Sequence, residues 1–260
     1  MTITTTPPMR VAVIGGSGLA GSAVVRSLVR RGHEAVSVSR GSGVDVTTGD
    51  GLAAALDGVD TVIDVGNTAA EKPAAMIDFF VTSAANILAA EHEAGVRQHV
   101  LLSIIGVDRT RDYPHFTGKL AQETTVAGGG IPYTILRATE FFEFAESAVQ
   151  WGTKGDFSDV PPLLMQPIAV DDVAEALVDA ATAEPTNAIA EIAGPERHDL
   201  VDLARRIQAM RGGPALRLVP SWDQSGFGEE MAGNLLLPRD GAALAATTFD
   251  DWLRSSARSS

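Results

Sequence analysis

The chain has 260 residues, of which 45% are hydrophobic, with no cysteine and a formal net charge of −13 at pH 7. This length suits one large α/β domain, or a domain with a small appendage, and it allows a sizeable core without disulfides. The absence of cysteine excludes disulfide scaffolds, thiolate metal sites and cysteine nucleophiles, and it fits a reducing cytoplasm. The acidic balance argues against unaided binding to nucleic acid, which depends on Lys and Arg.

The opening "MTITTTPPMR" lacks the basic segment and apolar run of a signal peptide. No uninterrupted apolar run reaches the roughly 18 residues that a membrane span requires. We therefore expect a cytoplasmic protein without a membrane partner. His33, His92, His99 and His198 show no metal-ligand spacing, so no metal site is expected.

Strands and helices alternate along the chain from Arg10 to Ala138. Short β-rich runs have the apolar character of buried parallel strands, and the segments between them carry apolar residues at helical spacing. The expected strands are 10–15, 34–40, 60–66, 98–105 and 133–138, and the expected helices are 20–32, 51–58, 74–95 and 115–130. This alternation predicts an α/β fold with a doubly wound parallel sheet, in the strand order 3-2-1-4-5-6 of an NAD(P)-binding Rossmann fold.

The rhythm changes after Ala138. Residues 139–167 are rich first in aromatic residues and then in glycine and proline, which is typical of a lining or lid. Helices are expected at 170–184 and 199–213 and a strand at 188–194, whereas the remaining residues are weakly patterned. We expect a dinucleotide-binding core over 9–138, rejoined by the helix 168–184, and a small C-terminal substrate lobe made of 139–167 and 185–260.

A glycine cluster joins the first expected strand to the first expected helix. It matches two expressions, Gly16-x-Gly18-x-x-Gly21 and the longer-turn form Gly15-x-x-Gly18-x-x-Gly21, and the second is favoured because Gly15 directly follows the strand. Glycines allow the tight turn, the approach of a pyrophosphate to backbone N–H groups and close helix packing. The alternative is a glycine turn kept only for packing. The turn residues expected to bind a cofactor are Gly15, Ser17, Gly18, Leu19 and Gly21.

The end of the second expected strand favours NADP over NAD. NAD sites usually place a carboxylate there to accept from the ribose 2′-OH, whereas this chain has Ser39 and Arg40. Arginine binds a 2′-phosphate through two parallel hydrogen bonds. The alternative for Arg40 is an ordinary solvated surface charge.

Several motifs in chain order resemble the atypical short-chain dehydrogenase/reductases. These are the glycine cluster, "VDV" at 44–46, "GVDTVIDVGN" at 58–67, "NILAAEHEAGVRQHVLLSIIGVD" at 86–108, and "GGIPYTILRATEFFEF" at 129–144. The chain is most similar to the NmrA-like branch, which includes NADPH-dependent quinone reductases. The resemblance covers roughly residues 9–212.

The resemblance implies positions around the cofactor. Asp45 and Val46 would lie beside the adenine, and Gly66 and Asn67 would flank the ribose at the end of the expected strand 60–66. Lys119 matches the lysine that holds the nicotinamide ribose. The alternatives are an ordinary turn at Asn67 and a solvent-facing lysine at 119.

The resemblance also implies a reactive end. Ser103 lies at the end of the expected strand 98–105, where the family has a substrate-side serine, and Asn86 matches a structural or proton-relay asparagine. Thr139, Glu140 and Phe141 should approach the nicotinamide.

The chain departs from the dehydrogenase signature Tyr-x-x-x-Lys. Four residues before Lys119 stands His115, on the same helix face, and a histidine beside a lysine is pushed toward its neutral form. A neutral His115 can still donate one N–H to a substrate oxygen. The alternative is that His115 has no role in the chemistry. Tyr113 is a possible substitute for the missing tyrosine.

Two functions fit this pattern. The first is an NADP(H)-dependent oxidoreductase whose small-molecule acceptor is a conjugated carbonyl or a quinone, because such acceptors need little help from a protein acid. The second is a non-catalytic NAD(P)-binding sensor, favoured by the missing tyrosine. We expect a monomer or a homodimer. The aromatic residues that suit either a pocket lining for a flat acceptor or the core are Phe141, Phe142, Phe144 and Trp151.

Overall fold

The computed structural model describes residues 7–70, 72–110, 113–211, 216–222 and 228–256. The chain divides into two compact units, residues 1–137 with 173–190 and residues 138–172 with 191–260. The sequence analysis placed the corresponding boundaries after 138, 167 and 184. The first six residues of the opening segment and the expected end of a helix at 212–213 lie outside the described residues.

A seven-stranded parallel sheet forms the centre of the fold, in the order β12-β9-β5-β4-β3-β1-β2. Strand β1 lies between β2 and β3 and is parallel to both, with Ile14 opposite Val38 on one side and Asp64 on the other. The Rossmann fold expected from the sequence is thereby confirmed. The strands are β1 (Arg10–Ile14), β2 (Glu34–Val38), β3 (Thr61–Asp64), β4 (Gln98–Ile104), β5 (Tyr133–Ala138), β9 (Ala188–Ala193) and β12 (Ala243–Leu244).

The expected strand order was wrong at both edges. Beyond β2 the described sheet has no further strand, because residues 39–51 form the 3-10 helix η1 (Arg40–Ser42) and an isolated bridge between Asp45 and Asp50. Gly43, Gly49 and Gly51 have φ near +80°, and left-handed glycines of this kind interrupt an extended strand. The opposite edge is instead lengthened by β9 and β12.

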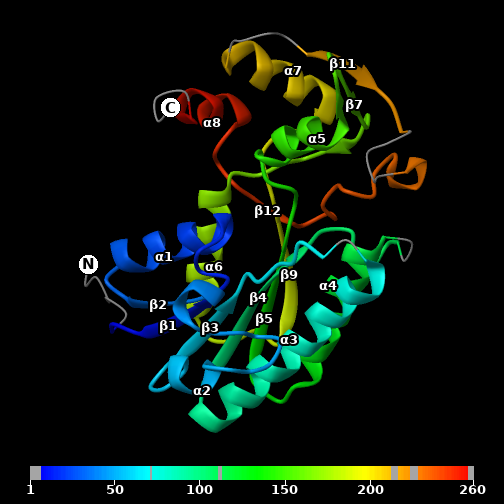
Figure 1. Cartoon of the computed structure of the whole chain (residues 1–260). Coiled ribbons are helices and arrows are strands. Elements are labelled where there is room, and N and C mark those ends of the chain that lie inside the picture. The colour runs from blue at the N-terminus through cyan, green and yellow to red at the C-terminus, as the bar shows by residue number, and fades with distance from the viewer. Residues whose placement is uncertain (1–6, 71, 111–112, 212–215, 223–227, 257–260) are drawn as a thin grey trace, which may run out of the picture. The chain divides into compact units, whose positions relative to one another are not determined.

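Helices cover both faces of the first unit's sheet, with α1 and α6 on one face and α3 and α4 on the other (Figure 1). Helices α1 and α6 are joined by ion pairs of Arg30 with Glu175 and of Arg31 with Asp179. A Cβ on Gly118 of α4 would lie 2.6 Å from the Phe80 ring of α3, so these two helices are in close contact. The helices are α1 (Leu19–Arg30), α2 (Leu52–Ala55), α3 (Pro73–Ala94), α4 (Pro114–Gly128) and α6 (Val170–Thr182).

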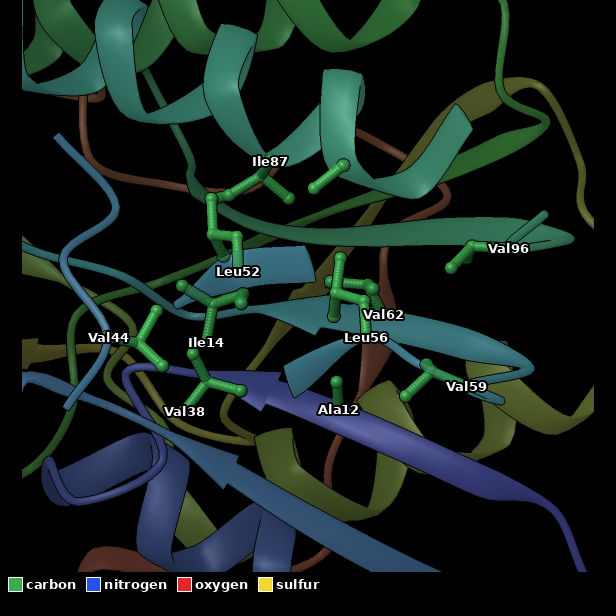
Figure 2. Close-up of a cluster of buried hydrophobic side chains, with 11 residues drawn as sticks. Ala12, Ile14, Val38, Val44, Leu52, Leu56, Val59, Val62, Ile87 and Val96 are labelled. Carbon is green, nitrogen blue, oxygen red and sulfur yellow. The ribbon is translucent and has the colours of Figure 1, made fainter. Parts of the chain in front are cut away.

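The core beside β1 packs strand residues against α2 and α3. Figure 2 shows Ile14, Val38 and Val62 of the sheet together with Leu52 and Ile87. All five side chains are almost fully buried. This packing fixes the carboxyl ends of β1 and β3, where the candidate site begins.

Among the described helices, α3 is long and apolar enough to cross a membrane, by length and composition only. Its Phe80, Ile87 and Leu88 are buried in the first unit. Core helices of globular domains meet the same criterion, so α3 is weak evidence for a span.

The second unit has its own aromatic core. Phe142 is buried and its ring lies 5.3 Å from Phe249 and 5.4 Å from Trp252, so Phe142 is a core residue and not a pocket lining. Trp151 is 60% exposed. Residues 139–167, expected as a lid, contain a helix and three short strands. The helices and strands of the second unit, apart from those in the seven-stranded sheet, are α5 (Phe144–Gly152), β6 (Thr153–Lys154), β7 (Phe157–Val160), β8 (Leu164–Met165), β10 (His198–Asp199), α7 (Leu200–Arg211), β11 (Arg217–Pro220), η2 (Glu229–Met231) and α8 (Phe249–Ser256).

Candidate functional site

The turn between β1 and α1 is shaped by its glycines. Gly15 has φ +78°, and a Cβ there would lie 3.1 Å from the Val65 carbonyl oxygen and 3.2 Å from Gly66 Cα. A Cβ on Gly21 would lie 2.1 Å from the Gly15 oxygen, so α1 can pack on the turn only with glycine at this position. A Cβ on Gly16 would also lie 2.9 Å from the Val13 carbonyl oxygen, so the first glycine of each form of the motif is sterically required.

Three amides of the turn, those of Gly15, Gly16 and Gly18, donate to backbone carbonyl oxygens, and the start of α1 is exposed. Ser17, Gly18 and Leu19 are exposed, and α1 begins at Leu19. The first N–H groups of a helix lack partners within the helix and carry partial positive charge, which favours a phosphate. A cradle lined by backbone, in which side chains are sterically excluded at Gly15 and Gly21, fits the pyrophosphate of a dinucleotide.

The loop after β2 carries the residues expected near the adenine. Ser39 caps η1 through a reciprocal pair of hydrogen bonds with Ser42, and Arg40 is exposed. The Asp45 carboxylate accepts hydrogen bonds from the Thr47 hydroxyl at 2.6 Å and the Thr47 amide at 2.8 Å. These bonds, with a smaller contribution from the charge of Arg40, lower the pKa of Asp45. Arg40 and Asp45 thus lie in the same short loop, and the charge of Arg40 favours the ionised form of Asp45.

Asn86 of α3 holds this loop in place. Its side-chain amide donates to the carbonyl oxygens of Val46 and Thr47, both at 3.0 Å. The Val46 side chain packs against the cluster in Figure 2. The structure therefore gives Asn86 a structural role at the loop expected to meet the adenine.

Lys119 lies inside the first unit. It is 4% exposed, and its Nζ donates to the Leu102 carbonyl oxygen at 2.7 Å and to Gln122 Oε1 at 2.6 Å. Burial lowers the pKa of Lys119 to about 8, against the opposing charges of Asp64 and Glu123. An amine in this state exchanges protons close to neutral pH.

His115 and Asn67, which are 48 residues apart in sequence, are in contact. His115 Nε2 lies 3.0 Å from Asn67 Oδ1, and the same oxygen accepts the Thr68 amide at 2.8 Å. Because a backbone amide can only donate, this contact identifies the Asn67 atom as oxygen, and His115 Nε2 must carry the hydrogen. Its Nδ1 is then a hydrogen-bond acceptor.

The electrostatics of His115 agree with a neutral ring. Burial and the charge of Lys119 lower the pKa of His115 to about 4. Its ring also meets Phe80 edge to face, with 5.3 Å between centroids, and Lys119 Nζ lies 5.2 Å from the same Phe80 ring. Tyr113 stands outside this group, as the N-cap residue of α4 with its ring against Phe116.

Ser103 is buried near the end of β4, and its hydroxyl has no hydrogen-bond partner within the described part of the chain. Thr139, Glu140 and Phe141, expected near the nicotinamide, belong to the second unit. The Thr139 hydroxyl is buried and likewise without a described partner, and burial raises the pKa of Glu140 to about 7.

A family model described as NAD(P)H-binding matches residues 15–184, from the first glycine of the turn to just beyond α6. The chain belongs to the NAD(P)H-binding family. This membership and the parallel fold confirm the expected relation to the atypical short-chain dehydrogenase/reductases.

Curated relatives of this NAD(P)H-binding protein include photosystem II assembly factor Ycf39 of Synechocystis, 26% identical over 149 residues. That match covers 52% of this chain and 46% of the relative. The chloroplastic divinyl chlorophyllide a 8-vinyl-reductase of Cucumis sativus is 28% identical, over 71% of this chain and 52% of the relative. The chain thus spans about half the length of the curated relatives it matches.

Solved structures share the fold at low sequence identity. MoeE5 in complex with UDP-glucose and NAD superimposes with a TM-score of 0.73 and 18% identity. The superposition covers 96% of this NAD(P)H-binding chain and 99% of MoeE5. At this identity the likeness establishes the architecture and nothing about the substrate.

Two residues of the site were missed by the sequence analysis. Asp64, the last residue of β3, accepts hydrogen bonds from the Gly66 amide and from Gln122 Nε2, each at 2.8 Å. Both Asp64 and Gln122 are 1% exposed. The available signal was a carboxylate ending the apolar strand "TVID", since buried charges are rare without partners.

Proposed function

We propose that this protein is an NADP(H)-dependent oxidoreductase whose acceptor is a small conjugated carbonyl or quinone-like molecule. The glycine cradle at Gly15 and Gly21 carries the proposal, because it leaves backbone amides at the start of α1 for a dinucleotide pyrophosphate. The bound nicotinamide supplies hydride. The protein binds the cofactor, orients the molecule that accepts the hydride, and holds or transfers a proton.

The state of His115 supports this choice of acceptor. At neutral pH the ring is uncharged and its Nε2–H is used by Asn67, so His115 is a weak proton donor. It instead offers Nδ1 as an acceptor to a hydroxyl of the bound molecule. Quinone-like acceptors suit such a site, because the phenolate they form after hydride addition is stable without a strong protein acid.

The proposal is tested by measuring NADPH oxidation against a panel of quinones and conjugated carbonyls, with simple ketones and keto-sugars as contrast. Turnover with the conjugated group alone supports it. Tight NADP⁺ binding with no turnover across the panel contradicts it and favours the non-catalytic sensor. One observation favours that second function, since two N–H groups of Lys119 are bonded to interior partners.

Replacing His115 with phenylalanine is expected to slow turnover roughly tenfold and to leave NADPH affinity within about twofold. The ring contact with Phe80 is kept, whereas Nδ1 can no longer accept a hydrogen bond from a hydroxyl group carried by the bound acceptor molecule, a bond worth about 1.4 kcal/mol. Steady-state kinetics and calorimetry measure the two effects. An unchanged rate would remove His115 from the mechanism.

Replacing Arg40 with aspartate is expected to weaken NADPH binding by roughly 10- to 100-fold and to improve NADH binding. The variant loses a charged hydrogen bond to the 2′-phosphate, worth about 1.5–3 kcal/mol, and gains an acceptor for the ribose hydroxyl. Arg254→Asp in α8 makes the same change in net charge at another exposed arginine and serves as control. An unchanged ratio of the two affinities refutes the assignment of Arg40.

A further inference from the structure

The inner face of α4 carries a row of polar side chains. His115, Lys119 and Gln122 stand at helical spacing on this face, and Lys119 and Gln122 are almost fully buried. Each has a partner at the carboxyl end of a strand or in the turn that follows it: Asn67 after β3, Leu102 in β4 and Asp64 in β3. Polar contacts thus hold α4 against the carboxyl ends of β3 and β4.

Four hydrogen bonds form one continuous chain in this region. The Gly66 amide donates to Asp64 Oδ1 and Gln122 Nε2 donates to Asp64 Oδ2. Lys119 Nζ then donates to Gln122 Oε1 and to the Leu102 oxygen. An ammonium can only donate and a carboxylate can only accept, so the orientation of the Gln122 amide is fixed from both sides.

An amide placed between a carboxylate and an ammonium has a definite electrostatic effect. A direct Asp–Lys pair in a buried site would hold the lysine firmly protonated. With Gln122 between them, Asp64 still attracts the charge of Lys119, but from a greater distance, and burial prevails in lowering the pKa of Lys119 to about 8. The site therefore contains a lysine that is located by hydrogen bonds yet not locked in one charge state.

We propose that Asp64 and Gln122 are positioning residues, which hold the Lys119 amino group at the carboxyl end of β4 and keep it able to gain or lose a proton. The consequence for turnover rests on the oxidoreductase function proposed above. Among the residues on the inner face of α4, Lys119 is then the one whose charge changes near neutral pH, whereas His115 stays neutral. The reaction should then depend on pH through Lys119.

Other charged and titratable groups surround Lys119 and enter its titration. Glu123 and His115 come from α4 itself. The buried pair of His99 on β4 and Glu91 on α3, with 2.7 Å between Nδ1 and Oε1, also acts on this region. None of these is altered in the variants below, so they form a constant background.

The sequence contains three lysines, Lys72, Lys119 and Lys154. Protein labelled with 13C at lysine Cε therefore gives three signals, whose titration can be followed by NMR without cofactor. We expect the Lys119 midpoint near pH 8, and the signals of the other two lysines serve as internal references.

Asp64→Asn is expected to lower the Lys119 midpoint by about one pH unit, because it removes a charge that favours the ammonium. Gln122→Glu is expected to raise the midpoint, because the carboxyl pair that it forms with Asp64 shares one proton and brings part of its negative charge directly to Nζ. The matched control is Gln98→Leu, another buried glutamine, whose amide donates to the Ala180 oxygen and which should leave the midpoint unchanged.

The inference is overturned if the Lys119 midpoint lies at the ordinary value of a lysine, about 10.4, or if neither Asp64→Asn nor Gln122→Glu moves it. Gln122→Glu alone decides the question if Asp64→Asn does not fold. The alkaline limb of NADPH oxidation should shift in the same direction as the NMR midpoint. If the variants shift the Lys119 midpoint but the protein shows no turnover, the proposed oxidoreductase function is refuted, whereas the proposed positioning of Lys119 is supported.

Discussion

Replacing Gly21 with alanine is expected to reduce the affinity for NADP⁺ and NAD⁺ by about 100-fold or more, equal to roughly 2.8 kcal/mol. The added methyl would stand 2.1 Å from the Gly15 oxygen and 2.6 Å from Gly16 Cα, so α1 must move away from the turn. The amides at the start of α1 are then displaced from the place beside the turn where they would meet the pyrophosphate. Isothermal calorimetry measures the loss.

Two companion variants separate lost binding from lost folding. Gly128→Ala at the end of α4 adds a methyl with no neighbour within 4 Å and should match the wild type in both binding and thermal unfolding. Gly18→Ala should fold, since Gly18 has φ −78° and a small shift of the Gly15 oxygen, 3.3 Å from the added methyl, relieves the contact. It should still weaken binding, because the methyl lies at the exposed turn. Wild-type affinity in Gly21→Ala would contradict the cradle assignment.

Replacing Arg137 with alanine is expected to lower the free energy of unfolding by about 3–5 kcal/mol, the usual cost of leaving a buried charge without its partner. Arg137 of β5 is 2% exposed. It donates two hydrogen bonds to the Glu123 carboxylate of α4, from Nε to Oε1 at 2.9 Å and from Nη2 to Oε2 at 2.6 Å. Its Nη1 also donates to Asp108 at 2.6 Å. Urea unfolding at pH 7 measures the loss.

The double variant Arg137→Met with Glu123→Leu should recover most of that stability, because both charges leave the interior together. Arg137→Lys should fall between the wild type and alanine, since a lysine cannot form the two parallel bonds to Glu123. If Arg137→Ala unfolds at the same urea concentration as the wild type, the pair does not anchor α4 to the sheet.

The first half of the fold was predictable because each buried parallel strand from β1 to β5 is a short apolar run and its helix often ends in glycine. Strand β5 has the same bounds in sequence analysis and structure, 133–138. The two-residue strands β6, β8, β10 and β12 have no measurable periodicity, and α8 is a short helix, so the second half gave little local signal.

The candidate site was predictable where a residue type has a local reason, as at Gly15 and Gly21. The contacts of the residues expected at the reactive end are not local. Gln122 meets Asp64 across 58 residues and His115 meets Asn67 across 48, and neither pair leaves a mark in the spacing of nearby residues. The neutral state of His115 likewise depends on burial, which a single sequence does not specify.

Helix α3 joins regions that sequence analysis treated separately. Phe80 touches the rings and ammonium at the reactive end, and Asn86, about 9 Å further along the helix axis, secures the loop expected at the adenine. Any attempt to exchange the nucleotide preference of this protein by transplanting the 39–50 segment from a relative must therefore carry a compatible residue at position 86. A graft that is incompatible with position 86 would lose the two hydrogen bonds from Asn86. We then expect α3 to tilt and turnover to slow at its Phe80 end.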